Sequence, residues 1–143
     1  MSPTFVRDEG HWLYRLSASE WIRAAQAELD RAERAYSSGD GRGGLAGARR
    51  AAGMALNGAL IVAPNAGWGR TYIEHLVALR GEPDLPDAVR EAARVLVDAA
   101  PARPGGPQLV VLRTKGTTER VVEAARDVIA HAFTVTCRAE PLS

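Results

Sequence analysis

The segment RDVIAH, Arg126 to His131, combines two residue types that together can handle a phosphate group and a proton. Arg carries a fixed positive charge and a planar fork of donors that matches a phosphate. His has an ordinary pKa near neutrality, so its neutral ring can accept a proton as a general base. The same six residues also fit an amphipathic helix with a surface Arg and a partly buried His. The sequence leaves both interpretations open.

A second Arg and His have the same spacing, Arg70 and His75 in RTYIEH. Five residues of helix turn through about 500°, so the two side chains of either pair point about 140° apart. One helix therefore cannot direct both side chains at one phosphate without a bulge or a second subunit. For His75 the simpler prediction is a hydrogen bond from a helix to a neighbouring loop.

A second candidate site follows the glycine-rich segment Gly39–Gly44, GDGRGG. The segment formally matches GxGxxG, but it follows a predicted helix rather than a strand, which does not fit a dinucleotide site. It precedes another predicted helix, whose N-terminal N–H groups could accept an anion. Arg42, Arg49 and Arg50 are the predicted phosphate-binding residues here, and a solvated charged face is the alternative.

The composition limits the classes of function. The chain has 143 residues, 46% of them hydrophobic and 24% charged, which fits one soluble globular domain. Its net charge of only +1 excludes a generally basic, nucleic-acid-binding surface. The single Cys137 excludes an internal disulfide and fits a reducing cytoplasm. We find no metal-ligand spacing and expect neither metal nor cofactor.

We expect no contact with a membrane and a cytoplasmic location. The N-terminus, MSPTFVRDEGHW, has no apolar region of the kind that a signal peptide needs. The most apolar run, Ala51 to Ala63, is about half as long as a membrane span and contains Asn57.

The pattern of apolar residues and helix breakers predicts an all-α fold, an antiparallel up-and-down bundle of four to five helices in a single domain, 1–143. We expect an N-terminal arm at 1–16, the bundle at 17–135 and a tail at 136–143. The first predicted helix starts at a Ser17–Glu20 capping box. The second and third cover about Leu45–Val62 and Thr71–Leu79. The fourth begins at Pro86, and the fifth begins after Thr117 as its cap. Gln108–Leu112, QLVVL, is predicted to be extended, and breaks are expected at Ser37–Gly44 and Pro101–Pro107.

Three segments resemble, in order, the HEPN family of small prokaryotic helical domains associated with nucleotidyltransferases. They are WIRAAQAELDRAERAYSSGD, LAGARRAAGMALNGALIVAPNAGWGRTYIEHLVAL and LVVLRTKGTTERVVEAARDVIAHAF, and together they cover about Ser19 to Phe133. The chain departs from the family where the second helix usually has Glu-Lys: it has Gly53-Met54 and Asn57-Gly58 instead.

The resemblance implies a homodimer whose Arg-x4–6-His motifs meet across the interface and cleave RNA without a metal ion. Arg126, Asp127 and His131 match this motif, because an Asp follows the Arg; a Thr follows Arg70. They are therefore the predicted catalytic residues of a toxin-type ribonuclease, with a nucleotidyltransferase-type antitoxin as partner and RNA or a nucleotide as ligand. Phe133 stands where some relatives have a Tyr that a partner enzyme modifies, and it has no hydroxyl for that reaction.

The resemblance also leaves a second function open. The chain could be a catalytically silent HEPN-like module that binds a nucleotidyltransferase partner. Its Ala-rich helices, with broad apolar faces, favour a homodimer in either case.

Overall fold

The computed structural model describes residues 15–100 and 108–139, and within these ranges every regular element is a helix. The predicted all-α class is thus confirmed. The expected N-terminal arm, except for its last two residues, and the expected break at Pro101–Pro107 lie outside the described residues. In the described part of the chain, no helix is both long and apolar enough to cross a membrane. The elements are α1 (Ala18–Ser37), α2 (Gly41–Val62), the 3-10 turn η2 (Ala66–Trp68), α3 (Tyr72–Arg80), α4 (Asp87–Asp98) and α5 (Gln108–Ala139).

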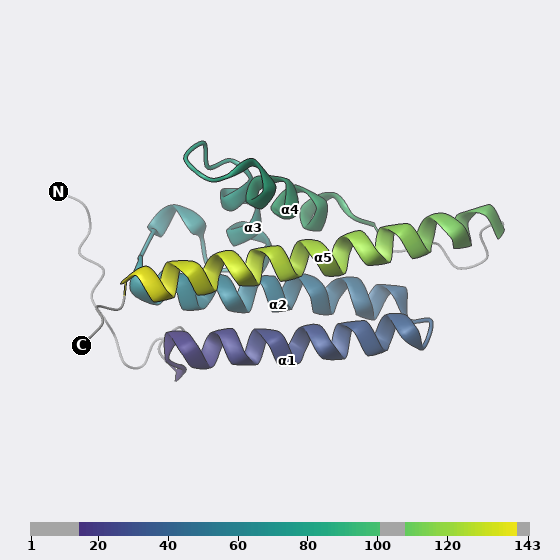
Figure 1. Cartoon of the computed structure of the whole chain (residues 1–143), viewed down its shortest axis with the longest axis horizontal. Coiled ribbons are helices and arrows are strands. Elements are labelled where there is room, and N and C mark those ends of the chain that lie inside the picture. The colour runs from purple at the N-terminus through teal and green to yellow at the C-terminus, as the bar shows by residue number, and fades with distance from the viewer. Residues whose placement is uncertain (1–14, 101–107, 140–143) are drawn as a thin grey trace.

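The helix α2 is the centre of the molecule, because it contacts α1, α3, α4 and α5. The three long helices α1, α2 and α5 lie side by side, and α1 runs in the opposite direction to the other two (Figure 1). The shorter α3 and α4 pack together on the side of α2 and α5 that is away from α1. The hydrophobic core fills the space between these helices.

The packing around α2 depends on small side chains. Leu56 and Leu60 are buried, as the sequence pattern predicted. Most of the other buried hydrophobic residues of α2 are Ala. A Cβ on Gly53 would lie 2.3 Å from the Tyr72 side chain, and one on Gly58 would lie 2.9 Å from the Ala18 carbonyl oxygen. These two glycines therefore let α3 and α1 approach α2 closely. They stand at the positions where the sequence departs from the HEPN pattern.

The capping box that the sequence predicts for α1 is present. The Ser17 hydroxyl accepts a hydrogen bond from the Glu20 N–H at 3.2 Å. In return, the Glu20 carboxylate accepts one from the Ser17 N–H at 3.0 Å. Two of the N-terminal donors of α1 thus have partners, which fixes where the helix begins.

The helix α2 begins at Gly41, earlier than the predicted Leu45. Asp40 is its N-cap, and the Asp40 carboxylate accepts a hydrogen bond from the Gly43 N–H at 2.8 Å. A Cβ on Gly43 would collide with that carboxylate. The glycines that suggested a longer loop therefore belong to the first turn of a capped helix.

The prediction for Gln108–Leu112 was wrong: this run is not extended but forms the start of α5. Thr117 does not cap a helix, because it lies nine residues inside α5. A short apolar run has no periodicity that distinguishes a strand from a helix. A lone strand would leave its backbone groups unpaired, whereas helix continues the hydrogen-bond ladder of the residues that follow. At its other end α5 reaches Ala139, so its last four residues lie beyond the expected bundle boundary.

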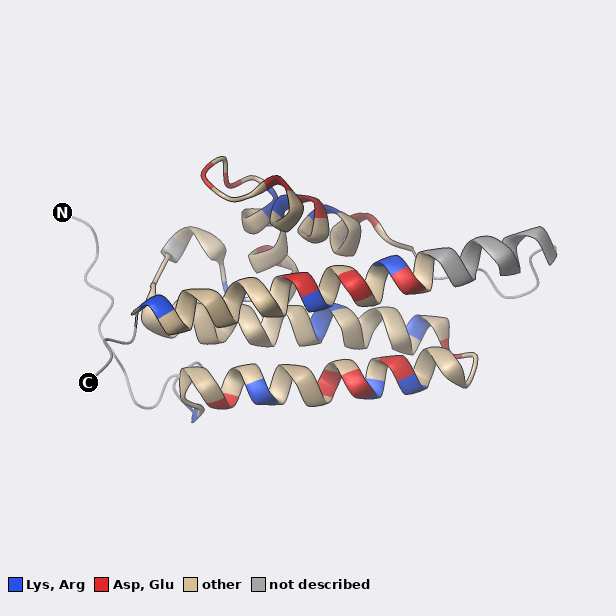
Figure 2. Cartoon of the chain, viewed as in Figure 1, with Lys and Arg blue, Asp and Glu red and all other residues tan. Residues whose placement is uncertain are grey.

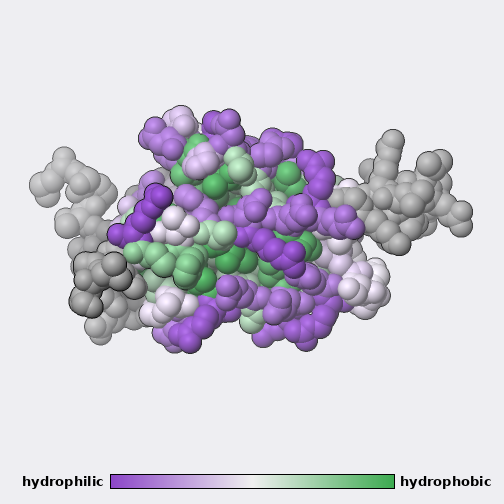
Figure 3. Space-filling model, viewed as in Figure 1, coloured by the Kyte–Doolittle hydropathy of each residue, from purple (hydrophilic) through white to green (hydrophobic). Residues whose placement is uncertain are grey.

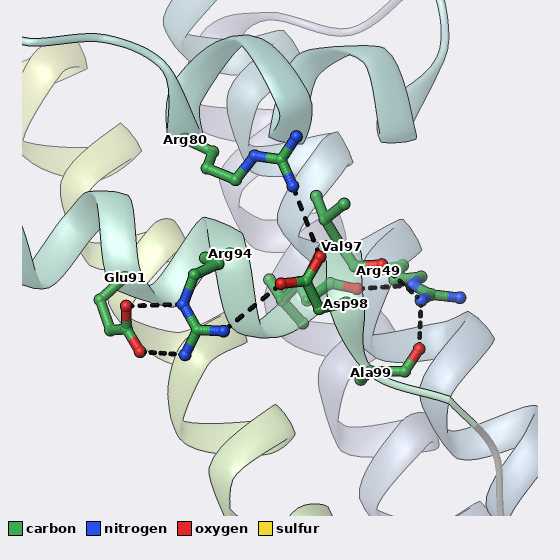
Figure 4. A network of polar contacts seen from close by, with 8 residues as sticks. Arg49, Arg80, Glu91, Arg94, Val97, Asp98 and Ala99 are labelled. Carbon is green, nitrogen blue, oxygen red and sulfur yellow. Dashed lines mark hydrogen bonds and ion pairs between the residues drawn. The ribbon is translucent and has the colours of Figure 1, made fainter.

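Both α3 and α4 contain charged residues (Figure 2), and some of their side chains join the two helices (Figure 4). The Asp98 carboxylate of α4 contacts Arg80 of α3 and Arg94 of α4, each at 3.4 Å. Arg94 also donates from Nε to Glu91 at 2.8 Å. This network holds the last turn of α3 beside the last turns of α4.

Candidate functional site

The predicted catalytic residues all lie on α5, and Arg126 has a partner from another helix. Its Nη2 donates a hydrogen bond to Glu33 Oε1 of α1 at 2.7 Å. The Arg126 side chain is still 58% exposed, so solvent reaches the guanidinium. Asp127, the next residue, is exposed. The other N–H donors of Arg126 remain available to a phosphate, which would meet the negative charge of Glu33 beside them.

His131 lies on the opposite flank of α5. Arg120 precedes His131 by eleven residues, or three helical turns plus about 20°, so the two residues lie on the same side of α5. The charge of Arg120 lowers the pKa of Glu91 of α4, so this side of α5 faces α4. Arg126, by contrast, faces Glu33 of α1. Since α5 is continuous through both residues, one chain does not bring Arg126 and His131 together.

The environment of His131 favours its neutral form. Burial lowers the pKa of His131, and the positive charge of Arg138 lowers it further. The ring is only partly buried, and within the described residues it has no hydrogen-bond partner. A neutral, accessible imidazole can accept a proton, so His131 has the protonation state that a general base needs.

The three predicted phosphate-binding residues do not form one cluster. Arg49 of α2 donates to the carbonyl oxygens of Leu96 at 2.7 Å, Val97 at 3.2 Å and Ala99 at 2.6 Å (Figure 4). These carbonyls end α4 and have no partner within the helix. A positive charge at this end also interacts favourably with the helix dipole. In this structure Arg49 therefore serves as the C-terminal cap of α4.

Arg50 and Arg42 differ from Arg49 in their surroundings. Arg50 pairs with the carboxylate of Glu28, a residue of α1 that is only 8% exposed and that also accepts from Arg31. Arg42 is exposed, and it has no ion pair in the described part of the chain. The N-terminus of α2 already receives the negative charge of Asp40. The Asp40 carboxylate therefore occupies the position at the N-terminus of α2 where the sequence suggested that an anion could bind.

His75 and Asn57 are the most deeply buried polar side chains among the described residues. The His75 Nδ1 lies 2.8 Å from the Trp68 carbonyl oxygen, which is the helix-to-loop hydrogen bond predicted from the sequence. Its Nε2 lies 2.9 Å from the side-chain amide of Asn57. Burial lowers the pKa of His75, although the Trp68 hydrogen bond and the Glu74 charge oppose this effect.

The protonation of His75 follows from these contacts. A neutral imidazole has one N–H, and the Trp68 carbonyl can only accept, so Nδ1–H donates to Trp68. Nε2 is then an acceptor, and the Asn57 amide serves it by presenting its NH2 end. This orientation also gives a partner to the Asn57 amide nitrogen, which otherwise has none. The group joins α2, η2 and α3 and has no exposed reactive atom.

Sequence reasoning missed three of these residues. Glu33 is 93 positions from Arg126, and Glu28 is 22 from Arg50, so no local spacing connects either pair. Asn57 offered a signal, since it is a polar residue within the most apolar segment of the chain. A buried amide needs a partner, and the nearby polar candidate of the following helix was His75.

Comparisons with known proteins give no relative. No protein-family model, no curated protein and no solved structure matches the chain. The described residues contain no group of three or more His, Cys, Asp or Glu that could hold a metal ion.

Proposed function

We propose that the chain is a HEPN-like helical module that binds a protein partner of the nucleotidyltransferase type, as a homodimer and in the cytoplasm. One observation carries this proposal. Of the arginines predicted to hold phosphate, Arg49, Arg50 and Arg126 each contact a carbonyl or carboxylate of the chain itself. Arg42 has no ion pair with a described residue. The carbonyls around Arg49 and the carboxylates beside Arg50 and Arg126 oppose the binding of a phosphate there, whereas a protein partner that docks elsewhere leaves these contacts in place.

The outward side of α3 supports a protein-binding role. Ile73 and Val77, one helical turn apart, are 42% and 43% exposed. Large apolar side chains on one surface are typical of the centre of a protein interface. A partner that covers them removes apolar area from water, and this area supplies the favourable free energy.

The test begins with the neighbouring genes, which this proposal expects to include one for a nucleotidyltransferase. That protein is co-expressed with the chain and purified through a tag. The wild-type chain should co-purify. Val77→Asp should weaken binding at least about tenfold, because a charge in an apolar interface is left without a partner. Ala27→Asp, which adds the same charge at an exposed position of α1, should bind like the wild type. Equal binding by all three proteins would show that α3 is not the interface.

Ribonuclease activity is the second candidate, and the state of His131 favours it. The lowered pKa of His131 leaves the ring neutral near pH 7, and the ring is accessible. In this function two copies supply Arg126 and His131 to one site, and the nucleotidyltransferase acts as an antitoxin. Cleavage should then persist in EDTA and leave 2′,3′-cyclic phosphate ends. Arg126→Ala and His131→Ala should each reduce the rate by about tenfold to a hundredfold.

A further inference from the structure

The flank of α5 that faces α1 has exposed side chains without charge near the end of the helix. Arg126 marks this flank, because it donates a hydrogen bond to Glu33 of α1. Phe133 and Cys137 follow Arg126 by seven and eleven residues, which is within about 20° of two and three full turns, so they lie on the same flank. Both are exposed, and Phe133, at 55%, is the most exposed large hydrophobic residue that the structure describes. This end of α5 is pale to green in Figure 3.

The facing flank of α1 is uncharged over the same length. The two helices are antiparallel and in contact, so Phe133, seven residues after Arg126, is level with about Gln26, seven residues before Glu33 (Figure 1). Gln26 and Ser19 are exposed, and both lie within about 40° of Glu33 around α1. The ion pair between Arg126 and Glu33 lies at one end of this surface, and the start of α1 lies at the other. We call its exposed residues the uncharged seam: Ser19, Gln26, Ala130, Phe133 and Cys137.

The chain enters α1 at the same end of the molecule as the uncharged seam. The structure describes the chain from Arg15 onwards, and the start of α1 and the end of α5 lie together at one end (Figure 1). Residues 1–14 lie outside the described residues, and their sequence includes Phe5 and Trp12. Fourteen extended residues can span about 46 Å, whereas α1 rises only about 14 Å over the nine residues to Gln26. The segment is therefore long enough to place its aromatic side chains along the seam.

We propose that residues 1–14 bind along the uncharged seam of their own chain and cover Phe133 and Cys137. The contact removes the Phe133 ring and the aromatic side chains of the segment from water, and this burial supplies the favourable free energy. The segment is attached beside the seam, so its effective concentration there is high and a small contact area is enough. This contact is separate from the proposed function, because it forms within one chain and does not involve α3.

Cys137, the single cysteine of the chain, reports whether the seam is covered. The full chain at micromolar concentration is treated with N-ethylmaleimide, an uncharged reagent, and mass spectrometry measures the rate of modification. The wild type should react at least about tenfold more slowly than Phe5→Ser/Trp12→Ser. A thiol that is covered in about nine molecules of ten reacts only through the uncovered one.

A substitution on the other side of the contact should have the same effect. Phe133→Ser should also raise the rate at Cys137 at least about tenfold, because the segment loses the apolar side chain that it covers. Phe133→Ser added to Phe5→Ser/Trp12→Ser should raise the rate little further, since both changes remove one and the same contact. Circular dichroism spectra of the variants should match the wild type, because Phe133 is exposed in the described fold.

Two controls separate the covering of the seam from general effects. Asp8→Ser/Glu9→Ser changes two polar residues of the same segment and should leave the rate at Cys137 as low as in the wild type. Ala27→Cys in a Cys137→Ser background places a thiol at an exposed position of α1, about 120° from Glu33 around the helix. This thiol should react at the same high rate with and without Phe5→Ser/Trp12→Ser.

Three results would overturn the proposal. The first is a wild-type Cys137 that reacts as fast as the thiol of Ala27→Cys, which would show that the seam is uncovered. The second is protection that is lost on dilution, which would identify a second copy as the cover. The third is protection that Phe133→Ser removes but Phe5→Ser/Trp12→Ser leaves in place, which would assign the cover to another segment. Binding of the nucleotidyltransferase is measured separately with Val77→Asp, so its failure would leave this contact untouched.

Discussion

Two pairs of Arg and His with identical spacing lie in very different parts of this molecule. Arg70 precedes α3, and His75 lies within it. The His75 side chain is fully buried between α2, η2 and α3. Arg126 and His131 lie on α5, where both are reached by solvent. In both histidines burial lowers the pKa. The difference is in the partners: both ring nitrogens of His75 have one, and those of His131 have none in the described chain.

The comparison shows that spacing alone does not distinguish a structural His from a reactive one. A ring whose two nitrogens are held by a carbonyl and an amide contributes to stability and exposes no atom to a substrate. A ring without partners contributes little to stability and remains accessible. The two histidines should therefore respond in opposite ways to substitution.

The largest expected effect is at His75. His75→Ala should lower the free energy of unfolding by about 3 to 5 kcal/mol, since it leaves a cavity and removes a partner from Asn57 and from the Trp68 carbonyl. His131→Ala should lower it by less than about 1 kcal/mol, because that side chain is partly exposed. Urea denaturation near pH 7.5 gives both values. Similar losses in the two variants would contradict the comparison.

The next effect compares two arginines. Arg49→Met should lower the free energy of unfolding by about 2 to 4 kcal/mol, because three carbonyls at the end of α4 lose a charged donor. Arg126→Met removes one exposed ion pair and should lower it by less than about 1 kcal/mol. The same denaturation experiment measures both. If Arg126→Met were the more damaging, its pair with Glu33 would be a main support of the fold.

The fold was largely predictable where the local pattern decides it. The Ser17–Glu20 capping box, the buried face with Leu56 and Leu60, and the all-α class follow from spacing within a few residues. The start of α5 was not predictable, because its apolar run fits a strand as well as a helix.

The site was predictable only in its local part. Arg126 and His131 share a helix, and their separation around it follows from helical geometry. The partners Glu33 of Arg126 and Asn57 of His75 come from other helices, so their positions depend on tertiary packing. The role of Arg49 at the end of α4 depends on packing in the same way.

A smaller effect is expected from pH. The pKa values of His75 and His131 are lower in the folded chain than the ordinary value of 6.5, so the unfolded chain takes up protons first as the pH falls. The free energy of unfolding should therefore be constant just above that pH and decline below it, at most about 1.4 kcal/mol per pH unit for each group. Denaturation at a series of pH values should show a shallower decline in His75→Gln than in the wild type. An unchanged decline would mean that His75 does not contribute.

The smallest effect is expected at Glu33. Glu33→Gln removes one exposed ion pair, so the free energy of unfolding should change by less than about 1 kcal/mol. Asp30→Asn, at an exposed acidic position of α1 without an ion pair among the described residues, is the control. Thermal unfolding of the two variants should give nearly equal midpoints, and a much lower midpoint for Glu33→Gln would assign a structural role to the pair.

The central claim is that RDVIAH is not a complete catalytic site and that the chain acts by binding protein. The most direct test incubates the chain, purified on its own, with single-stranded and structured RNA in EDTA. We predict that the RNA remains intact, with the wild type, Arg126→Ala and His131→Ala giving the same result. Cleavage by the wild type that leaves 2′,3′-cyclic phosphate ends and is lost in both variants would contradict the claim and identify the chain as a ribonuclease.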